Sequence, residues 1–331
     1  MALALVVFVS GALISLATSW LLVTRLERIG ERLGLSEALL GILAALAADA
    51  PEITSSVSAL SQHQRVIGAG VVIGSNVFNL AALLGLGAVV AGSISLHRRV
   101  VILGGVVAVW ISVCCLATTT GFIPVVPSLV CASIVFAGYL IILGLHHDSR
   151  PRLPLPRRVS SWLCAAIEED ELDLEEANRP TRGRPIDVVI AAIALIIVVI
   201  SSVAMERSAS SLGHHFHIAD AIIGGLILAA VTSLPNAVAA VHLASKGRGA
   251  AALSTALSSN NLNVVFGLLI PGVIVGLAAP SFAGNLAATS YLLLTVLVLV
   301  MAYAQRGLNR LSGSIIIGGY FVFVLWLLAT K

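Results

Sequence analysis

The chain has 331 residues, of which 58% are hydrophobic and only 11% are charged, and its mean hydropathy is +1.04. A soluble domain carries about 25% charged residues, so the composition excludes an ordinary soluble protein and indicates one that has lipid as its solvent. The formal net charge of +3 says little about partners; we expect contact with the lipid bilayer and none with nucleic acid.

Apolar stretches long enough to cross a bilayer recur along the chain, since a crossing needs about 20 mostly apolar residues. The first stretch lacks a basic start and is longer than the apolar part of a secretion signal, which predicts a retained helix. We therefore predict an all-α membrane protein with about ten transmembrane helices, near residues 2–24, 36–61, 66–91, 98–119, 124–146, 186–206, 217–245, 249–277, 285–305 and 313–330.

The basic residues test this count, because Lys and Arg stay on the cytoplasmic side of a membrane protein. Of the 19 basic residues, 16 fall in the odd-numbered loops between the predicted helices, and the even-numbered loops hold only Arg65 and Arg207. We therefore expect an integral protein of the cell (plasma) membrane with both termini outside and the central loop in the cytoplasm.

The chain contains an internal repeat. Residues 41–62 and 66–87 align without a gap with 225–246 and 250–271, at one constant offset of 184 positions. The matched polar and proline positions are Pro51 with Pro235, Ser75 with Ser259, Asn76 with Asn260, and Asn79 with Asn263. Polar residues are rare inside lipid, so this match indicates a true duplication.

The two copies are separated by five predicted helices. Because five is odd, the copies enter the membrane from opposite sides, which is the inverted-topology repeat of many secondary transporters. We predict a first five-helix repeat at 1–146, a cytoplasmic linker at 147–185 and a second five-helix repeat at 186–331. The two motifs would then face each other near the middle of the membrane.

Asp49 and Glu52 are the two acidic residues that lie deep inside a predicted helix. A carboxylate there costs at least about 2.5 kcal/mol, and no Lys or Arg lies near the middle of any predicted helix. A bound cation or proton must therefore offset the cost. The two acids share a helix face, and because neighbouring charges oppose joint ionisation, the site without a metal ion could hold a proton.

Pro51 and Pro235 each remove a backbone donor, which kinks the helix and frees carbonyl oxygens. Carbonyl, carboxylate, Ser and Asn oxygens are hard ligands, which suit Ca²⁺, Na⁺ or Mg²⁺. Both acids lie on one helix, whereas an intramembrane aspartyl protease needs two acids from different helices. We therefore expect a site for inorganic cations, with no enzymatic activity and no cofactor.

The motifs resemble those of the calcium/cation antiporter superfamily, which includes sodium/calcium and cation/proton exchangers. Its members carry two inverted repeats, each with a G-T-S-x-P-E-like segment followed by G-S-N-x-x-N/D. The first copy here reads A-A-D-A-P-E and G-S-N-V-F-N, and the second reads V-T-S-L-P-N and S-S-N-N-L-N. Asn236 thus stands where the family has its second Glu, while Asp49 adds an acid to the first copy.

This resemblance implies a secondary active antiporter that moves Ca²⁺ or a related cation in exchange for Na⁺ or H⁺. A passive cation channel and a homologue that regulates without transporting are the alternatives. We expect Asp49 and Glu52 to bind the cation directly. Neutral oxygens, or groups that orient the acids, would come from Ser75, Asn79, Thr232, Ser233, Asn236, Ser259 and Asn263.

Two further segments have simpler interpretations. The central loop carries apolar residues at helical spacing between 159 and 167, which predicts a short helix on the membrane face, and an acidic run at 168–176 that we interpret as a solvated linker. Three histidines, His214, His215 and His217, fall in a predicted outer loop and are interpreted as loop residues.

Overall fold

The structure is a computed structural model of the whole chain, and it describes residues 1–34, 37–144, 158, 161–163, 165–166, 183–245 and 249–329. The acidic run 168–176 and most of the predicted linker 147–185 lie outside these residues. The short helix predicted at 159–167 is described only at 158, 161–163 and 165–166, which are helical.

Eight helices in the described ranges are long and apolar enough to cross a membrane. Two of them are continuous runs of three segments, one formed by α4, η1 and α5 and the other by α13, η4 and α14. They are α1 (Ala2–Leu33), α4 (Arg65–Asn79) with η1 (Leu80–Leu86) and α5 (Gly87–Ala91), α6 (Arg98–Thr119), α7 (Val125–Gly144), α9 (Pro185–His215), α13 (Gly249–Leu262) with η4 (Asn263–Leu269) and α14 (Ile270–Val275), α15 (Phe282–Gln305), and α16 (Arg310–Ala329).

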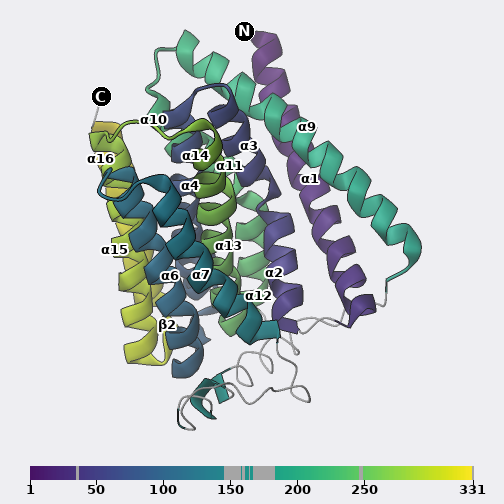
Figure 1. Cartoon of the computed structure of the whole chain (residues 1–331), viewed down its shortest axis with the longest axis vertical. Coiled ribbons are helices and arrows are strands. Elements are labelled where there is room, and N and C mark those ends of the chain that lie inside the picture. The colour runs from purple at the N-terminus through teal and green to yellow at the C-terminus, as the bar shows by residue number, and fades with distance from the viewer. Residues whose placement is uncertain are drawn as a thin grey trace.

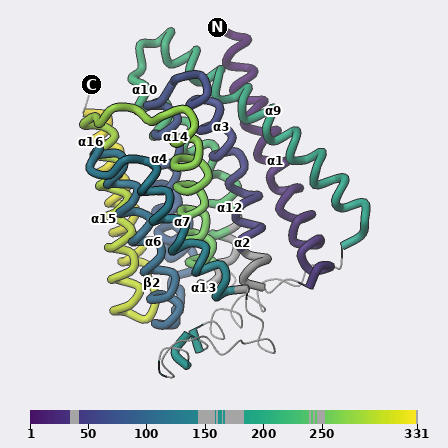
Figure 2. The backbone as a smooth tube through the Cα atoms, viewed as in Figure 1, coloured from purple at the N-terminus to yellow at the C-terminus, as the bar shows by residue number. Residues whose placement is uncertain are grey.

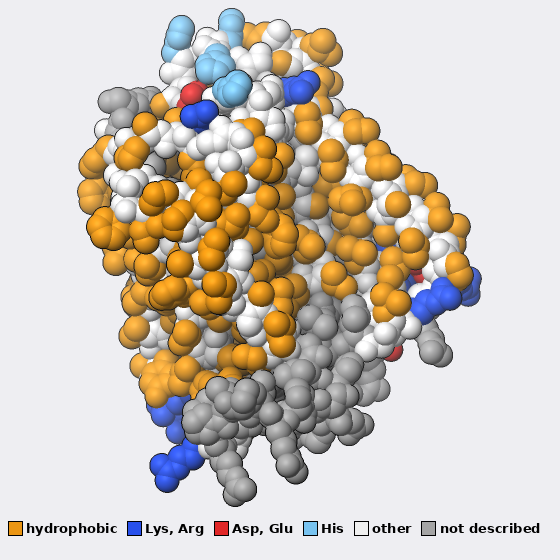
Figure 3. Space-filling model, viewed as in Figure 1, with side chains coloured by type: hydrophobic (Ala, Val, Ile, Leu, Met, Phe, Trp, Pro, Cys, Tyr) orange, Lys and Arg blue, Asp and Glu red, His pale blue; other side chains and the backbone are white. Residues whose placement is uncertain are grey.

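Two more predicted spans are each broken near their middle. The first divides into α2 (Glu37–Ala48) and α3 (Ala50–Ser61). The second divides into a run formed by α10 (Asp220–Ile222), η3 (Ile223–Leu228) and α11 (Ala229–Thr232), followed by α12 (Leu234–Ser245). The prediction of an all-α membrane protein is confirmed. Figure 3 shows hydrophobic side chains over the middle of the visible face, with basic groups and histidines toward its ends.

The helices form two groups (Figures 1 and 2). α1 and α9 are antiparallel to each other and lie obliquely beside the bundle formed by the other helices. The N-terminus and the end of α16 lie at one end of the molecule, whereas α7 ends and α9 begins at the other. At this second end the loops after α5 and α15 pair as a small antiparallel sheet of β1 (Ser93–Ser95) and β2 (Gly307–Asn309), which the sequence did not predict.

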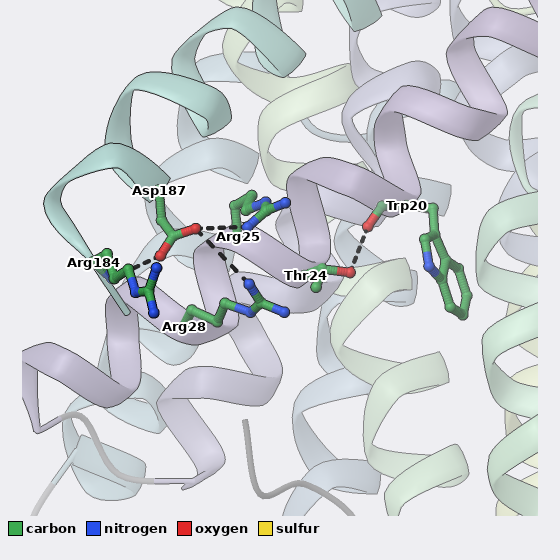
Figure 4. A network of polar contacts seen from close by, with 6 residues as sticks. All are labelled: Trp20, Thr24, Arg25, Arg28, Arg184 and Asp187. Atoms are coloured by element: carbon green, nitrogen blue, oxygen red, sulfur yellow. Dashed lines mark hydrogen bonds and ion pairs between the residues drawn. The ribbon is translucent and has the colours of Figure 1, made fainter. Parts of the chain in front are cut away.

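An ion pair joins α1 to the start of α9 (Figure 4). Arg25 Nη1 lies 2.7 Å from Asp187 Oδ1, and the Nη1 atom of Arg28 lies 4.0 Å from the same oxygen. Asp187 Oδ2 accepts the backbone N–H of Arg184 at 2.7 Å, so the carboxylate also caps its own helix. Ser15 and Ser202 hydroxyls meet at 2.9 Å farther along the pair. Polar contacts therefore fix α1 against α9 at two levels.

Both helices are longer than predicted. α1 continues to Leu33 rather than ending near 24, because the added segment is rich in Leu, Arg and Glu, which favour helix. Gly34, with φ 69°, ends it in the left-handed conformation that glycine adopts without strain. α9 likewise continues to His215 rather than ending at 206. The arginines placed in the first loop, Arg25, Arg28 and Arg32, are therefore helical.

The backbones of α4 and η3 touch through glycine. A Cβ atom at Gly74 would clash with the backbone of Gly225, and one at Gly224 would clash with the carbonyl of Ile67. Small residues allow membrane helices to approach closely, where dispersion forces replace the hydrophobic effect as the source of attraction. This contact joins the first motif region to the second.

We predict that Gly74→Ala destabilises the protein, because the added methyl group must push η3 away from α4. Overpacking of this kind costs about 1–3 kcal/mol, so thermal unfolding in detergent should begin at a lower temperature. Gly138→Ala on α7 is the matched control, since nothing lies within 4 Å of its Cβ position. Equal unfolding temperatures for the two variants would contradict the close α4–η3 contact.

Candidate cation site

The chain departs from helix at Asp49, between α2 and α3, where φ is −80° and ψ is −5°. Pro51 follows, and because it has no N–H, the carbonyl of Ala47 loses its partner within the helix. The Ser19 hydroxyl of α1 donates to this carbonyl at 3.1 Å. The break is therefore stabilised from a neighbouring helix, and it places Asp49 and Glu52 in the interior, where both are fully buried.

The second copy breaks at the equivalent residue. Ser233, 184 positions after Asp49, has φ −83° and ψ −1° between α11 and α12. A second irregularity also repeats, because the helix widens into a π-helix directly after Asn79 and again from Asn263. In Figure 1, α2 and α3 run toward the end that holds the N-terminus, whereas α11 and α12 run away from it. The two copies thus share these two irregularities and run in opposite directions.

Asn236, at the start of α12, connects the two acids. Its Nδ2 atom donates to Asp49 Oδ1 at 2.6 Å and to Glu52 Oε1 at 3.2 Å. The Ser259 hydroxyl of α13 also donates to Asp49 Oδ1, and Ser233 lies beside Glu52. Acids from the first copy are therefore held by donors from the second.

Four asparagines form reciprocal hydrogen bonds between α4 and the run of α13 and η4. Asn76 Nδ2 donates to the carbonyl of Asn260 at 3.1 Å, and Asn260 Nδ2 donates to the carbonyl of Asn76 at 3.1 Å. Asn79 Nδ2 donates to Asn260 Oδ1 at 3.1 Å, and Asn263 Nδ2 donates to Asn76 Oδ1 at 3.3 Å. Equivalent residues thus exchange equivalent bonds, as they do around a local two-fold axis.

Several buried acceptors in this network have no hydrogen-bond donor among the described residues. They are Asp49 Oδ2, Glu52 Oε2, Asn79 Oδ1, Asn236 Oδ1 and Asn263 Oδ1. Buried polar atoms in proteins are nearly always paired, so five such oxygens in one network need a positively charged or donor partner. Chemically, this donor set can hold a hard cation or a proton.

Most of the predicted site residues are brought together. Asp49, Glu52, Asn236, Ser259 and Asn79 form one hydrogen-bonded chain, since Asn79 Nδ2 also reaches Ser259 Oγ at 3.3 Å. Asn263 joins through Asn76 and Asn260. Ser75 is buried on α4 but has no bonded partner among the described residues. Thr232 is also buried, and its hydroxyl donates to the Leu228 carbonyl of its own helix at 2.9 Å.

Other polar residues of this region were not predicted as part of the site. Asn76 and Asn260 were recognised only as matching positions, and Ser19 carries no sequence signal that relates it to Pro51. The expectation that Asp49 and Glu52 are the only acids deep in the helices is wrong, because Glu206 is also fully buried. It was placed at the end of a span, whereas α9 continues for more than two further turns.

Comparisons with known proteins agree with this architecture. The model of the family described as sodium/calcium exchanger protein matches residues 3–146 and 186–329. Among curated proteins, sodium/potassium/calcium exchanger 2 of Gallus gallus and of Homo sapiens are 30% and 31% identical over 125 residues. Each alignment covers 35% of this chain but only 19% of the relative, so the chain aligns with about a fifth of these longer proteins.

Two solved structures resemble the chain over nearly its whole length. The sodium-calcium exchanger NCX_Mj, soaked with Na⁺ and without Ca²⁺, gives a TM-score of 0.64 at 18% identity and covers 98% of both chains. The H⁺/Ca²⁺ exchanger CAX gives a TM-score of 0.72 at 15% identity and covers 97% of this chain and 82% of its own. At these identities the likeness establishes the fold.

We predict that Ser19→Ala weakens the break at Asp49, because it leaves the buried Ala47 carbonyl without a donor. The loss should be about 0.5–1.5 kcal/mol of unfolding free energy, measured by thermal or denaturant unfolding in detergent. Ser10→Ala on the same helix is the control, since its hydroxyl is exposed and donates within α1. Equal stability of the Ser19→Ala and Ser10→Ala variants would show that the Ser19 hydrogen bond does not stabilise the break.

Proposed function

Since this chain belongs to the sodium/calcium exchanger family, we propose that it is a secondary active antiporter that moves Ca²⁺ or a related cation across the membrane in exchange for Na⁺ or H⁺. The cation is the transported substrate, and no cofactor takes part. The binding site lies at the interface of the two repeats, near the middle of the membrane.

The observation that carries this proposal is the buried pair Asp49 and Glu52, joined by Asn236 and surrounded by oxygens that lack donors. No described Lys or Arg forms an ion pair with either acid. A buried carboxylate without a charged partner is strongly unfavourable. A bound cation removes this penalty, and the neutral oxygens of Asn79, Asn236 and Asn263 complete its coordination.

Ca²⁺ fits this donor set best among the hard cations. Two carboxylates neutralise one divalent ion, and Ca²⁺ takes six to eight oxygen ligands in flexible geometry. Mg²⁺ keeps several of its waters and prefers near-ideal octahedral geometry, which a fully buried set of side-chain oxygens does not favour. We expect Asp49 and Glu52 to bind the ion directly, and the Ser and Asn groups, with Thr232, to supply neutral oxygens or hold the acids.

The same electrostatics favours exchange over one-way release. If Ca²⁺ leaves, two carboxyl groups remain close together out of water, and neighbouring charges of one sign cannot both ionise there at low cost. Protons or Na⁺ must replace the departing ion before the site can become accessible again from the side on which Ca²⁺ bound. Binding of the second ion is thus a condition of the cycle, which is the basis of antiport.

The repeat supplies a route for alternating access. We assign residues 1–146 and 186–331 to two inverted repeats and 147–185 to a cytoplasmic linker, with both termini outside the cell membrane. The support is the shared break at Asp49 and Ser233, the shared π-helical turns, and the reciprocal asparagine bonds. Two halves of similar shape and opposite direction can adopt two conformations, open to either side.

We predict gradient-driven uptake by the purified protein in proteoliposomes. Ca²⁺ should accumulate against its gradient when Na⁺ or H⁺ is concentrated on the opposite side, and uptake should saturate with Ca²⁺. Uptake that needs no opposing gradient and carries single-channel currents would instead identify a passive channel. Binding of Ca²⁺ without any uptake would identify a regulatory homologue.

We also predict that Asp49→Asn and Glu52→Gln each reduce uptake to the level of protein-free liposomes, because one charge no longer suffices for a divalent ion. Both replacements are isosteric, so folding in detergent should be retained. Ser112→Ala on α6 is the control, since this buried hydroxyl bonds only within its own helix. Unchanged uptake in both acid variants would refute the site.

A further inference from the structure

Glu206 is a third buried carboxyl group, separate from the acid pair. It lies on α9 and has no solvent exposure. Its Oε2 atom accepts the hydroxyl of Ser58, in the last turn of α3, at 2.7 Å and the Nε2 donor of Gln62, the residue directly after α3, at 3.0 Å. Gln62 Nε2 also reaches the Ser58 hydroxyl at 3.0 Å. These bonds tie α9 to α3.

The second oxygen of this carboxyl group has no partner. Glu206 Oε1 is buried and receives no hydrogen bond from the described residues. The two ion pairs in the described part of the chain both involve Asp187, at the far end of the helix. Arg207 follows Glu206 directly and its positive charge acts on this carboxyl group through space, but Arg207 is exposed and forms no ion pair with it. An ionised Glu206 would therefore be a buried charge without an ion-pair partner, which is costly.

Glu206 lies between the proposed cation site and the end of the molecule that holds the N-terminus. Ser58 follows Glu52 by six residues on α3, which corresponds to about 9 Å along a helix. The same stretch of α9 buries further hydroxyl groups, at Ser201, Ser202, Ser208 and Ser210. If the offset of 184 positions is extended to α1 and α9, Glu206 corresponds to Leu22, which is buried and apolar. The buried carboxyl group is then not repeated in the first half of the chain.

We propose that Glu206 is a proton-binding site, with the proton on Oε1, between the acid pair and the end of the molecule that holds the N-terminus. A metal ion would need several oxygen ligands, but Ser58 and Gln62 direct donors, not acceptors, at this carboxyl group. One proton neutralises it without any further ligand. When the proton leaves, it passes to water at that end, and the α9–α3 contact must hydrate or loosen.

The surroundings contain few other groups that could titrate in its place. α9 packs against α1, α3 and η3 at this level. The charged residues of α1 begin at Arg25, at the opposite end, η3 carries none, and α3 carries only Glu52. The charged and titratable groups at the near end of the molecule are exposed or partly exposed: the N-terminal amine of Met1, His63, Arg65, Arg207, His214, His215, His217 and Asp220.

The test is infrared difference spectroscopy of the full chain in lipid nanodiscs. Asp49 and Glu52 can themselves carry a proton, so the background is the double variant Asp49→Asn and Glu52→Gln. At neutral pH this double variant should still show the C=O band of a protonated carboxyl group, and adding Glu206→Gln should remove it. The band should persist when Asp220→Asn, which removes a partly exposed carboxyl group near the same end, is added instead. A band that survives Glu206→Gln in the double variant, or no such band in the double variant itself, would overturn the proposal.

Ser58→Ala is the second variant, in case Glu206→Gln does not fold. It removes one donor to Oε2, so the same band should shift in frequency without loss, and an unshifted band would count against Glu206 as its source. The spectra do not depend on transport. A protein that shows the band but exchanges no ions would refute the antiporter and leave this site standing, whereas exchange without the band would refute this site alone.

Discussion

The hydrogen bonds from the side-chain amide of Asn236 are the interaction on which the centre of this protein depends. Asn236 donates from the second half of the chain to carboxyl oxygens of both Asp49 and Glu52 in the first half. Carboxyl groups out of water are tolerated only when donors or positive charge surround them, so the acids and the second motif require each other. The helix breaks, the paired prolines and the packing of α12 against the α2–α3 break all serve to bring these three side chains within hydrogen-bonding distance.

The two halves share a shape while differing in charge. Asp49 and Ser233 have nearly the same backbone dihedral angles, and the helix widens at Asn79 and at Asn263. Yet both acids of the centre come from the first half, and the second half supplies neutral donors. The shared backbone irregularities therefore do not require the same charges in both halves.

The sequence predicted the parts of this structure that arise from local composition. The lengths of the apolar stretches predicted the membrane helices. The polar pattern around Pro51 and Pro235 predicted where two helices break and most residues of the central network. The sequence did not predict the donor from Ser19 or the burial of Glu206. These depend on which helices become neighbours, because Ser19 and Ser58 acquire their partners only when α1 and α9 pack against α2 and α3. The helical extension to Leu33 was also missed, although the composition of that segment favours helix.

The π-helical segments have a consequence for comparing this chain with its relatives. A π-helix bonds each carbonyl to the amide five residues on, so each turn holds more residues than an α-helical turn. Every side chain after η1 and η4 is therefore rotated relative to an uninterrupted α-helix. An alignment that assumes uniform helical periodicity will assign the wrong face to residues 87–91 and 270–275, and lipid-facing positions would be mistaken for interior ones there.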